Sequence, residues 1–518
     1  MFRFLRILLV LVVLYLGSAF VFQHLYPVPV PDARSDSTAI PASDATRLGR
    51  AVMPAAAAQP GRSGVARLED GITAFAARMA MADAADASID ARYYIWQRDA
   101  TGLLLLDALQ RAAARGVRVR LLLDDNGVPD IGSELAELDA HPNLEVRLFN
   151  PFVLRRPRML SYALDFRRVN RRMHNKSFTV DGVATVVGGR NIGDNYFSQD
   201  PDTNYFDMDV VALGPAAEAV SADFDRYWAS PSSVPASLLL PGRAADGGVI
   251  AAGLAGVRAA PEAAEFERTL TGLRLIEQVM DGTRGFDWVA ARLVSDDPSK
   301  GQGPVPEEAL LTTRLLSILP EVKREVLLVS AYFVPGDRLT GILTGWARRG
   351  LDVQVLTNAQ EATDVLPVHA GYRKYRGDLV AAGVKVYELK SRQQRRDLAE
   401  QFGLIGSTNS SLHAKTFVID RSQIFVGSFN FDPRSAQLNT EMGLLIDSPA
   451  LAAYVARGFD HGLKRRAYLV ERAGSSGLRW RETDDSGAIV VHDTEPGTTA
   501  LSRILVRVIG WLPIEALL

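Results

Sequence analysis

The chain has 518 residues, of which 47% are hydrophobic and 23% are charged, and its formal net charge is −2 at pH 7. This length and composition exclude a small module or a disordered tail and predict two or three domains with sizeable cores. The near-zero charge gives no overall attraction to nucleic acid, and the absence of cysteine excludes disulfides, thiolate zinc sites and cysteine nucleophiles. No cluster of histidines and carboxylates with metal-ligand spacing occurs, so neither a metal nor a cofactor is implied.

The N-terminus carries a long apolar segment. Arg3 and Arg6 precede an uninterrupted apolar run over residues 7–22, a length between that of a signal sequence and that of a membrane-spanning helix. Apolar residues also flank this run, so we expect residues 1–26 to be an uncleaved membrane anchor rather than a cleaved signal sequence. The two arginines would then lie in the cytoplasm, and the rest of the chain would lie on the periplasmic side of a bacterial inner membrane.

The remainder of the chain divides by composition and pattern. Residues 27–64 are rich in Pro, Ala, Ser and Asp with little periodicity, which predicts a flexible linker. Two related domains are expected at 65–245 and 311–470. Residues 246–310 form an inter-domain segment without an interpretable motif, and residues 471–518 form a C-terminal tail.

An internal repeat relates the two expected domains. Each contains a strand that leads through an apolar helix to another strand. These elements are predicted at 90–96, 102–115 and 117–123 in the first domain and at 328–333, 341–349 and 351–356 in the second. The alternation predicts an α/β fold in which each domain is an α/β/α sandwich, and the repeat predicts that the two domains are related by a pseudo-twofold axis and share an interface.

Two segments, one in each domain, repeat a single pattern of polar and small residues. The first comprises His174, Lys176, Asp181, Gly188, Gly189 and Asn191, and the second comprises His413, Lys415, Asp420, Gly427, Ser428 and Asn430. Chance should give only roughly 0.1 His-x-Lys pairs in a chain so poor in lysine and histidine. Because the pair occurs twice with the same following residues, we interpret it as functional rather than as ordinary core or surface positions.

Each segment predicts a β-hairpin. Strand side chains alternate between faces, so His174 and Lys176 should point the same way. Asp181 and Asp420 fall at the hairpin turns, where we expect them to shape the turn and pair with a cation rather than to transfer protons. The small residues that end each return strand could let a phosphate or a backbone approach closely, and the asparagines follow near a helix start that could hold an anion.

A doubled set of histidine, lysine and asparagine suits chemistry on a phosphodiester. Lysine is a compact charge well matched to phosphate oxygen, and histidine can act as nucleophile, base or acid near neutral pH. Two such sets placed face to face supply one histidine to attack phosphorus and another to protonate the leaving oxygen. The lysines and asparagines would stabilise the pentacoordinate charge.

The paired pattern resembles the HKD motifs of the phospholipase D superfamily. Stretches such as Tyr93-Tyr94-Ile95-Trp96 and Leu148-Phe149-Asn150-Pro151 extend the similarity to the bacterial cardiolipin synthases, most closely those of type C. This resemblance implies phosphatidyl transfer to phosphatidylglycerol through a phosphatidyl-histidine intermediate, with His174 as nucleophile and His413 as acid and base. The donor would be phosphatidylglycerol or phosphatidylethanolamine, and the sequence leaves open a helper protein.

Two acids follow the motifs at the starts of apolar strands. A carboxylate there can accept a hydrogen bond from one imidazole nitrogen and leave the other free. The resemblance implies that each acid supports the histidine of its own half, so that Asp207 would serve His174 and Glu441 would serve His413. We prefer Asp207 to Asp209 because Asp-Met-Asp-Val-Val aligns with Glu-Met-Gly-Leu-Leu. The alternative interpretation is that both are solvated carboxylates at strand edges.

Basic residues precede each motif. They are Arg155, Arg156, Arg158, Arg167, Arg168, Arg171 and Arg172 in the first domain, and Lys390, Arg392, Arg395 and Arg396 in the second. Such runs either lie in solvated loops or bind anionic head groups at a membrane surface. A nucleic-acid partner would require interleaved aromatic residues and a basic domain, and neither is evident.

The C-terminal tail ends in a segment that mixes Arg503 and Arg507 with many apolar residues. It is too short and too charged to span a membrane, so we expect either an amphipathic segment in the membrane interface, with Trp511 at the head-group level, or a tail packed on the core. The two apolar ends favour a phospholipid substrate. Phospholipid hydrolysis, a nuclease and an inactive lipid-binding protein are the alternatives.

Overall fold

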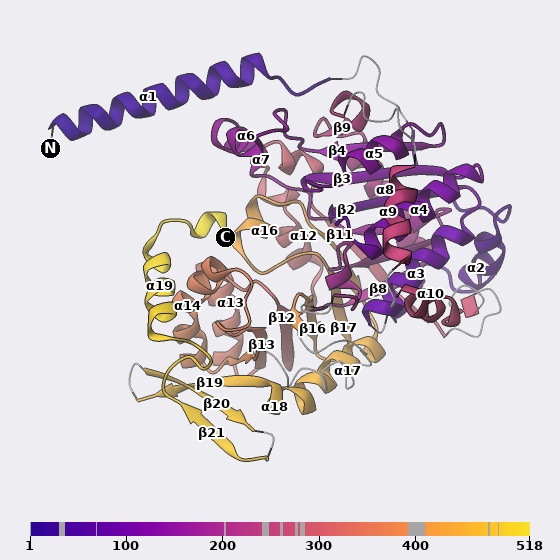
Figure 1. Ribbon diagram of the computed structural model, residues 1–518. Helices are drawn as coiled ribbons and strands as arrows, with labels where there is room; N and C mark the ends of the chain where they lie inside the picture. Colours follow the sequence, from indigo (N-terminus) through magenta and orange to yellow (C-terminus); the bar gives the residue numbers. More distant parts are fainter. Residues whose placement is uncertain are drawn as a thin grey trace.

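The computed structural model describes residues 2–30, 37–68, 70–200, 204–240, 248–259, 263–274, 278–279, 285–391, 410–474, 477–484 and 486–518. Two mixed β-sheets, one in each half of the chain, are flanked by helices (Figure 1). The first half occupies the indigo and magenta part of the ribbon and the second half the orange and yellow part. The α/β class and the two-domain arrangement predicted from the sequence are confirmed.

The first sheet has nine strands in the order β10-β1-β8-β6-β5-β2-β3-β4-β9. Its strands are β1 (Ser63–Leu68), β2 (Ser88–Ile95), β3 (Arg118–Gly127), β4 (Leu144–Phe149), β5 (Ser177–Val180), β6 (Ala184–Gly188), β8 (Asp209–Leu213), β9 (Ser233–Pro235) and β10 (Asp287–Val289). The β2-β3-β4 pairs are parallel, and β5 and β6 form an antiparallel hairpin beside them. The first motif therefore lies at the centre of the sheet.

Helices cover both faces of the first sheet. They are α3 (Gly71–Ala84), α4 (Ala100–Ala114) and α5 (Gly132–Asp139) on one face and α8 (Pro215–Trp228) on the other. Alternate residues of β2 show the division, since Ile89 and Tyr93 join the core beneath α3 and α4. Arg92 points the other way and pairs with Asp223 of α8 at 2.6 Å. Successive side chains of β2 thus point to opposite faces of the sheet, and each face is covered by its own layer of helices.

The second sheet has ten strands in the order β11-β18-β17-β16-β12-β13-β14-β19-β20-β21. Its strands are β11 (Ala291–Ser295), β12 (Glu325–Ser330), β13 (Asp352–Asn358), β14 (Lys385–Leu389), β16 (Lys415–Ile419), β17 (Gln423–Gly427), β18 (Met442–Ile446), β19 (Ala467–Ala473), β20 (Gly477–Thr483) and β21 (Ile489–His492). Its helices include α12 (Leu311–Ile318), α13 (Gly336–Arg348), α14 (Leu366–Ala381), α16 (Pro433–Gln437), α17 (Pro449–Arg457) and α18 (Leu463–Arg466). The hairpin β16–β17 occupies the place that β5–β6 has in the first sheet.

The repeated strand, helix and strand predicted in each half are present with shifted bounds. The largest shift is in α13, which begins at Gly336 rather than at Gly341. The sequence predicts a helix start at Gly341, but this glycine lies inside α13. A Cβ at this position would meet no atom within 4 Å, so packing does not require a glycine there.

One hydrophobic cluster spans the contact between the two halves. Val187 and Val210 of the first sheet belong to the same cluster as Val426 and Leu444 of the second. The chain passes from β10 in the first sheet to β11 in the second through Ala290 alone. Residues 246–310 thus supply one edge strand to each sheet, which their sequence did not reveal.

The segments outside the two domains are also structured. Residues 27–64 were expected to form a flexible linker, but they include α2 (Arg47–Ala57). Thr46 caps the start of this helix, since its side chain accepts a hydrogen bond from the Gly49 amide, and the helix buries Leu48 and Val52. These two apolar positions, four residues apart, give one packed face in a segment whose overall composition suggested disorder.

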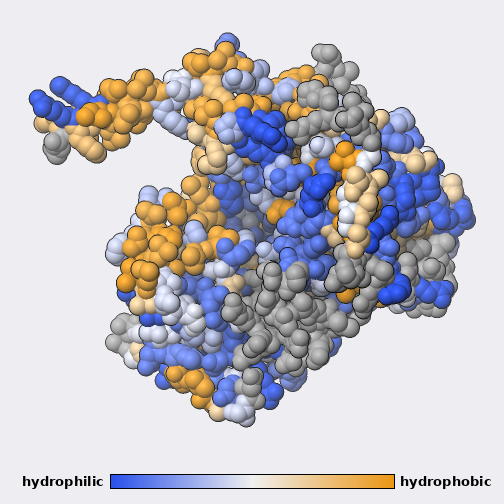
Figure 2. Space-filling model, viewed as in Figure 1, coloured by the Kyte–Doolittle hydropathy of each residue, from blue (hydrophilic) through white to orange (hydrophobic). Residues whose placement is uncertain are grey.

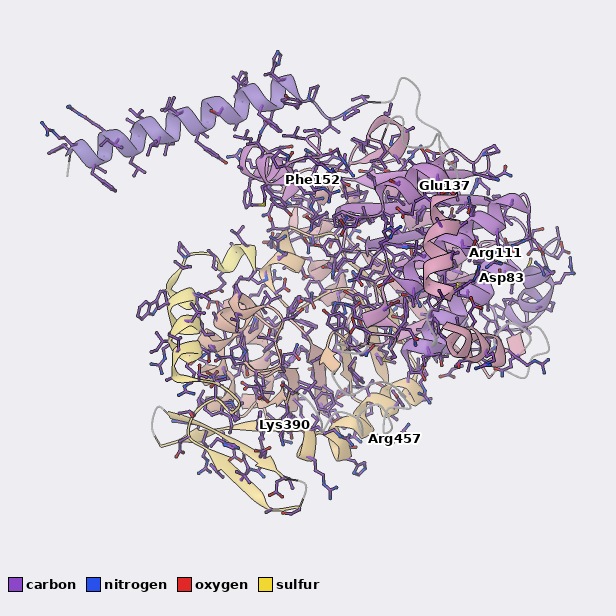
Figure 3. The ribbon with its side chains drawn as sticks, viewed as in Figure 1. Asp83, Arg111, Glu137, Phe152, Lys390 and Arg457 are labelled. Carbon is purple, nitrogen blue, oxygen red and sulfur yellow. The ribbon has the colours of Figure 1, made fainter. Side chains whose placement is uncertain are left out.

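Polar side chains at the surface form contacts between neighbouring helices. Asp83 of α3 and Arg111 of α4 form an ion pair at 2.8 Å (Figure 3). Glu137 of α5 accepts hydrogen bonds from the amides of Gly248 and Ile250, at the start of α9 (Val249–Arg258). The ion pair is about half exposed and contributes little to stability, so the buried apolar faces of these helices hold them in place.

Candidate active site

His174 and His413 lie at the seam between the halves, where only 7% and 6% of their surfaces are exposed. Each histidine precedes the hairpin of its motif rather than lying within the first strand, since β5 begins at Ser177 and β16 at Lys415. The residues just before the hairpins are extended and pair with the opposite half. The segment before each histidine therefore pairs with the opposite half, and the hairpin after it pairs within its own sheet.

The pairing across the seam is reciprocal. Met173 forms a parallel bridge with Thr440, and the His174 amide donates to the Thr440 carbonyl at 2.9 Å. In the same way β15 (Ser410–Leu412) pairs in parallel with β7 (Asn204–Phe206), and the His413 amide donates to the Phe206 carbonyl at 2.8 Å. Each half thus holds the histidine of the other beside its own acid.

The acids consequently serve the opposite histidines. His174 Nδ1 lies 2.8 Å from a Glu441 carboxylate oxygen, and His413 Nδ1 lies 2.6 Å from an Asp207 oxygen. The expectation that each acid supports the histidine of its own half is wrong, because the segments before the hairpins cross the seam. Both acids are buried, with 0% and 2% of their surfaces exposed, which excludes the solvated alternative. Nε2 of each imidazole is left for a substrate.

A network around Glu441 fixes the position of that carboxylate. The Ser428 hydroxyl donates to it at 2.5 Å, and the Glu441 amide donates to Asp296 at 2.9 Å. Asp296 also pairs with Lys300 at 2.9 Å in the interior. Ser295 to Lys300 had no interpretable motif in the sequence, and their role appears only when the fold brings them beside β18.

The lysines are buried with the histidines. Lys176 and Lys415 are each 1% exposed, and the ammonium group of each donates to the carbonyl of the histidine two residues before it. The Lys176 ammonium group also lies 5.6 Å from the centre of the Tyr94 ring. Since both ammonium groups are desolvated, a bound phosphate would attract them more strongly than it would in water.

Aromatic rings that sequence reasoning missed enclose both imidazoles. Tyr94 meets His174 edge-on at 5.1 Å between ring centres, and Tyr196 meets His413 in the same way at 5.2 Å. Tyr205 lies 5.1 Å from His413. Tyr94 belongs to the Tyr-Tyr-Ile-Trp stretch that carries the family resemblance, so a signal for it was present. The rings exclude water and limit the rotation of the imidazoles.

The two asparagines differ in their surroundings. Asn191 accepts a hydrogen bond from the Ile95 amide at 3.1 Å and donates to the Tyr196 hydroxyl at 2.9 Å, so both ends of its amide are engaged. Asn430 is 4% exposed, and its side-chain oxygen has no partner within the described part of the chain. A buried orphan oxygen of this kind is a candidate for a substrate contact.

Asp181 and Asp420 lie at the hairpin turns, at the far end of each hairpin from the histidines. Their backbones are left-handed, with φ of 53° and 51°. Asp181 accepts hydrogen bonds from the amides of residues 86, 87 and 88, and Asp420 from those of residues 323, 324 and 325. These hydrogen bonds connect the first turn to the start of β2 and the second turn to the start of β12. Backbone amides are the hydrogen-bond partners of both carboxylates, and at Asp420 a cation is also close, since the Arg324 guanidinium donates to the Asp420 carbonyl at 2.8 Å. The structure brings neither acid into the catalytic cluster.

The small residues at the ends of the return strands allow the acid strands to come close. A Cβ on Gly189 would lie 2.4 Å from the Asp207 carboxylate, and a Cβ on Gly188 would lie 1.9 Å from that of Asp209. A Cβ on Gly427 would lie 2.3 Å from the Met442 carbonyl. These glycines are thus required by protein packing, and phosphate binding by them and by Ser428 stays a prediction.

Burial sets the protonation of the cluster. Desolvation, aided by the nearby lysines, lowers the pKa of both His174 and His413 well below its usual value. Desolvation also lowers the pKa of Lys176 to about 7 and raises the pKa of Glu441 to about 7. A neutral imidazole is the form that can attack phosphorus, and a bound phosphodiester anion would favour the charged lysine.

Most of the first basic stretch is engaged inside the protein. Arg172 pairs with Asp124 at 3.2 Å, Arg155 pairs with Asp125 at 2.6 Å, and Arg171 donates to two backbone carbonyls. Carboxylates and backbone carbonyls of the protein therefore engage these arginines, which do not form a free cationic surface. In the second stretch, Arg392, Arg395 and Arg396 lie outside the described residues. Within the residues that the structure covers, no group of three or more His, Cys, Asp or Glu could hold a metal ion.

Comparisons with known proteins identify the family of the chain. A family profile described as "Cardiolipin synthase, PLD-like domain" matches residues 79–228 and 315–463. The chain is 42% identical over 475 residues to cardiolipin synthase C of Escherichia coli, covering 91% of this chain and 100% of that protein. It is 27% identical to the major cardiolipin synthase ClsA of Bacillus subtilis, covering 72% and 64% of the two chains.

A solved structure shares the fold. The phosphatidylserine synthase of Haemophilus influenzae superimposes with a TM-score of 0.54 at 14% identity, over 82% of this chain and 92% of that one. The profile covers both halves and includes His174 and His413 with their acids and lysines. The chain therefore belongs to the cardiolipin synthase family of proteins with PLD-like domains.

Proposed function

We propose that the protein is a cardiolipin synthase, which transfers a phosphatidyl group from a donor phospholipid to phosphatidylglycerol. The observation that carries the proposal is the pair of buried imidazoles at one seam, each with Nδ1 on a carboxylate and with a lysine two residues away. This arrangement provides a nucleophile and a separate proton donor for one phosphorus atom. The similarity to cardiolipin synthase C supports phospholipids as donor and acceptor.

In the first step Nε2 of His174 attacks the donor phosphorus, and the bond from phosphorus to the head-group oxygen breaks. The bound phosphodiester anion and the Asp207 carboxylate, 2.6 Å from Nδ1, favour the protonated form of His413. His413 gives its Nε2 proton to the departing alcohol, which leaves a phosphatidyl-histidine and a neutral His413. Glu441 holds the Nδ1 proton of His174 and stabilises the positive charge that develops on its ring. Lys176 and Lys415 offset the negative charge on the phosphoryl oxygens.

In the second step His413 acts as the base. It removes a proton from a glycerol hydroxyl of phosphatidylglycerol, whose oxygen attacks phosphorus while the bond to His174 breaks. The products are cardiolipin, a free His174 and a protonated His413 ready for another turnover. Water in place of phosphatidylglycerol would give phosphatidic acid, so exclusion of water decides between synthesis and hydrolysis.

The lipid products test this proposal directly. The purified full-length protein would be incubated in detergent micelles with labelled phosphatidylglycerol, with and without phosphatidylethanolamine, and the lipids separated. We expect cardiolipin, with release of glycerol or of ethanolamine identifying the donor. Phosphatidic acid as the main product would instead show a phospholipase D, and no product from folded protein would show an inactive lipid-binding protein.

We also propose that α1 (Phe2–Leu25) anchors the protein in the inner membrane. Within the described residues it is the one helix long and apolar enough to cross a membrane, and none of its most apolar window is buried. Apolar side chains cover α1 and the outer face of α19 (Ala500–Trp511) in Figure 2. Of these, Leu501 and Trp511 are 77% and 81% exposed, which suits an interfacial helix.

Single cysteines report which side of the membrane the domains occupy, because the chain has none of its own. A membrane-impermeant maleimide should label Ser317→Cys, on the exposed side of α12, in intact spheroplasts. It should label Phe2→Cys only after lysis, because that end of α1 would face the cytoplasm. The reverse pattern would place the catalytic domains in the cytoplasm, and loss of the Phe2→Cys label from the mature protein would show cleavage.

A further inference from the structure

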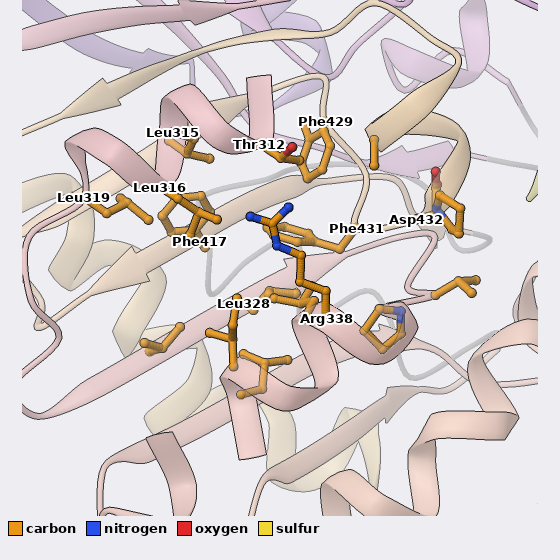
Figure 4. A pocket seen from close by; sticks show the side chains of 18 of the residues that line it. Thr312, Leu315, Leu316, Leu319, Leu328, Arg338, Phe417, Phe429, Phe431 and Asp432 are labelled. Atoms are coloured by element: carbon orange, nitrogen blue, oxygen red, sulfur yellow. The ribbon is translucent and has the colours of Figure 1, made fainter. Parts of the chain in front are cut away.

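An apolar cavity lies in the second half, next to the strand that carries Lys415. Its volume is about 300 Å³, and it lies between α12 and α13 over β12 and β16 (Figure 4). Aliphatic and aromatic side chains make up most of its wall, including those of Leu315, Trp346 and Phe417. Arg338 of α13 reaches across it toward Phe431. No step of the mechanism above uses this cavity.

The cavity adjoins the catalytic groups. Lys415 and Phe417 lie two residues apart on β16, so their side chains share one face, with about 7 Å of strand between them. On the other side, Phe431 and Asp432 line the cavity and directly follow Asn430. Asp432 accepts a hydrogen bond from the Ser435 amide at 2.7 Å, and the Ser435 side chain hydrogen-bonds to Glu441. Lining residues of the cavity thus neighbour Lys415 and Asn430 along the chain and connect through Ser435 to Glu441.

The fold itself does not require this space. In the first half, the same face of the sheet is filled by Arg78 of α3, which pairs with Asp209 at 2.8 Å in the interior. Arg190 also lies within 3.7 Å of Asp209. In the aligned second motif, Phe429 stands in place of Arg190 and Gly443 in place of Asp209. The buried polar cluster of one half is thus replaced by an apolar cavity in the other.

We propose that this cavity binds one acyl chain of the phospholipid whose phosphate lies between His174 and His413, an inference that rests on the proposed function. An acyl chain is attached to that phosphate through glycerol, so it must leave the histidines along some apolar path. The cavity lies along the strand that carries Lys415, and its wall is mostly aliphatic and aromatic, so it suits an acyl chain better than a polar head group. Each methylene that it buries should raise affinity by about a factor of four.

Filling the cavity should change the preference for chain length. Ile342 lines the cavity on α13, and Leu316 lines it on α12 with 41% of its surface exposed, so Leu316→Trp should fold even if Ile342→Trp does not. With dioleoyl phosphatidylglycerol we expect kcat/KM to fall at least about tenfold in either variant, the equivalent of two or more methylenes. With the dihexanoyl lipid, which cannot fill the cavity, kcat/KM should stay within twofold.

Ser317→Trp is the matched control, because Ser317 neighbours Leu316 on α12 but faces solvent. It should leave both rates unchanged. An equal loss with long and short chains in the cavity variants, or no loss with either, would overturn the acyl-chain site.

Photocrosslinking tests occupancy independently of turnover. Phosphatidylglycerol with a diazirine near the end of one acyl chain should label cavity residues such as Leu315 and Trp346. It should do so in a His413→Ala variant as well, because binding does not need the proton donor. Labelling without cardiolipin synthesis by the unaltered protein would retain the acyl-chain site and overturn the proposed function.

Two outcomes would overturn the acyl-chain site instead. One is cardiolipin synthesis with labels found only outside the cavity. The other is equal labelling of the cavity by a free fatty acid that carries the same diazirine, with no loss of this labelling when excess phosphatidylglycerol is added. That result would identify a cavity that accepts apolar molecules in general.

Discussion

Replacement of His174 by alanine is expected to abolish cardiolipin synthesis, and replacement of His413 should do so as well, each lowering kcat by about 10⁴-fold or more. Both imidazoles have Nδ1 on a buried carboxylate and neither can take over the position of the other. Loss of His174 removes the group that bonds to phosphorus. Loss of His413 removes the proton donor for the first alcohol and the base for the second.

A substrate with a good leaving group separates the two roles. A p-nitrophenyl ester of phosphatidic acid needs no proton donor for the first step, because p-nitrophenolate leaves unaided. The His413→Ala variant should therefore release one equivalent of p-nitrophenolate per site in a burst and accumulate an acid-labile phosphatidyl-histidine. The His174→Ala variant should give no burst.

His461→Ala is the control, since His461 is exposed on the surface of the second half. It should retain full synthesis. Near-normal cardiolipin formation by either active-site variant would contradict the mechanism, and a burst in His174→Ala but not in His413→Ala would exchange the two roles.

The second prediction follows from the crossed pairs of histidine and acid. Glu441→Gln should impair the step that depends on His174, although Glu441 belongs to the other half, because its carboxylate lies 2.8 Å from His174 Nδ1. Asp207→Asn should impair the steps that depend on His413, 2.6 Å away. A neutral amide cannot stabilise the charged imidazole and can favour the wrong tautomer, so each change should cost about 10²- to 10⁴-fold in kcat.

The p-nitrophenyl substrate again distinguishes the outcomes. Glu441→Gln should lose the burst, as His174→Ala does, whereas Asp207→Asn should keep the burst and fail to turn over. Asp447→Asn is the matched control, because Asp447 directly follows β18 at the end far from Glu441 and is partly exposed. A burst in Glu441→Gln but not in Asp207→Asn would contradict this prediction. It would mean either that each acid acts within its own half or that His413 is the nucleophile. The bursts of His174→Ala and His413→Ala distinguish these two explanations.

The crossing has a structural cause in the two segments that precede the hairpins. Each leaves its own sheet and pairs in parallel with the chain before the acid of the other sheet, at Met173 with Thr440 and along β15 with β7. Neither half alone therefore contains a histidine with its acid. This exchange makes the seam part of the active site.

Much of the site could be predicted from the sequence. The doubled pattern determined the hairpins, because strand periodicity and the turn at Asp181 and Gly182 are local properties. The same pattern singled out His174, His413 and their lysines, because residue chemistry at a fixed spacing needs no knowledge of the fold. The apolar run at the N-terminus likewise predicted α1.

Long-range contacts decided the rest. The sequence could not show that Glu441 serves His174, 267 positions away, or that Asp296 and Lys300 support Glu441, since no local pattern encodes which strands meet at a seam. It also could not show that the carboxylates of Asp181 and Asp420 accept hydrogen bonds from backbone amides at the start of a neighbouring strand. Local chemistry thus determined what the site can do, and the tertiary structure decided which groups act together, because that depends on the register between two sheets.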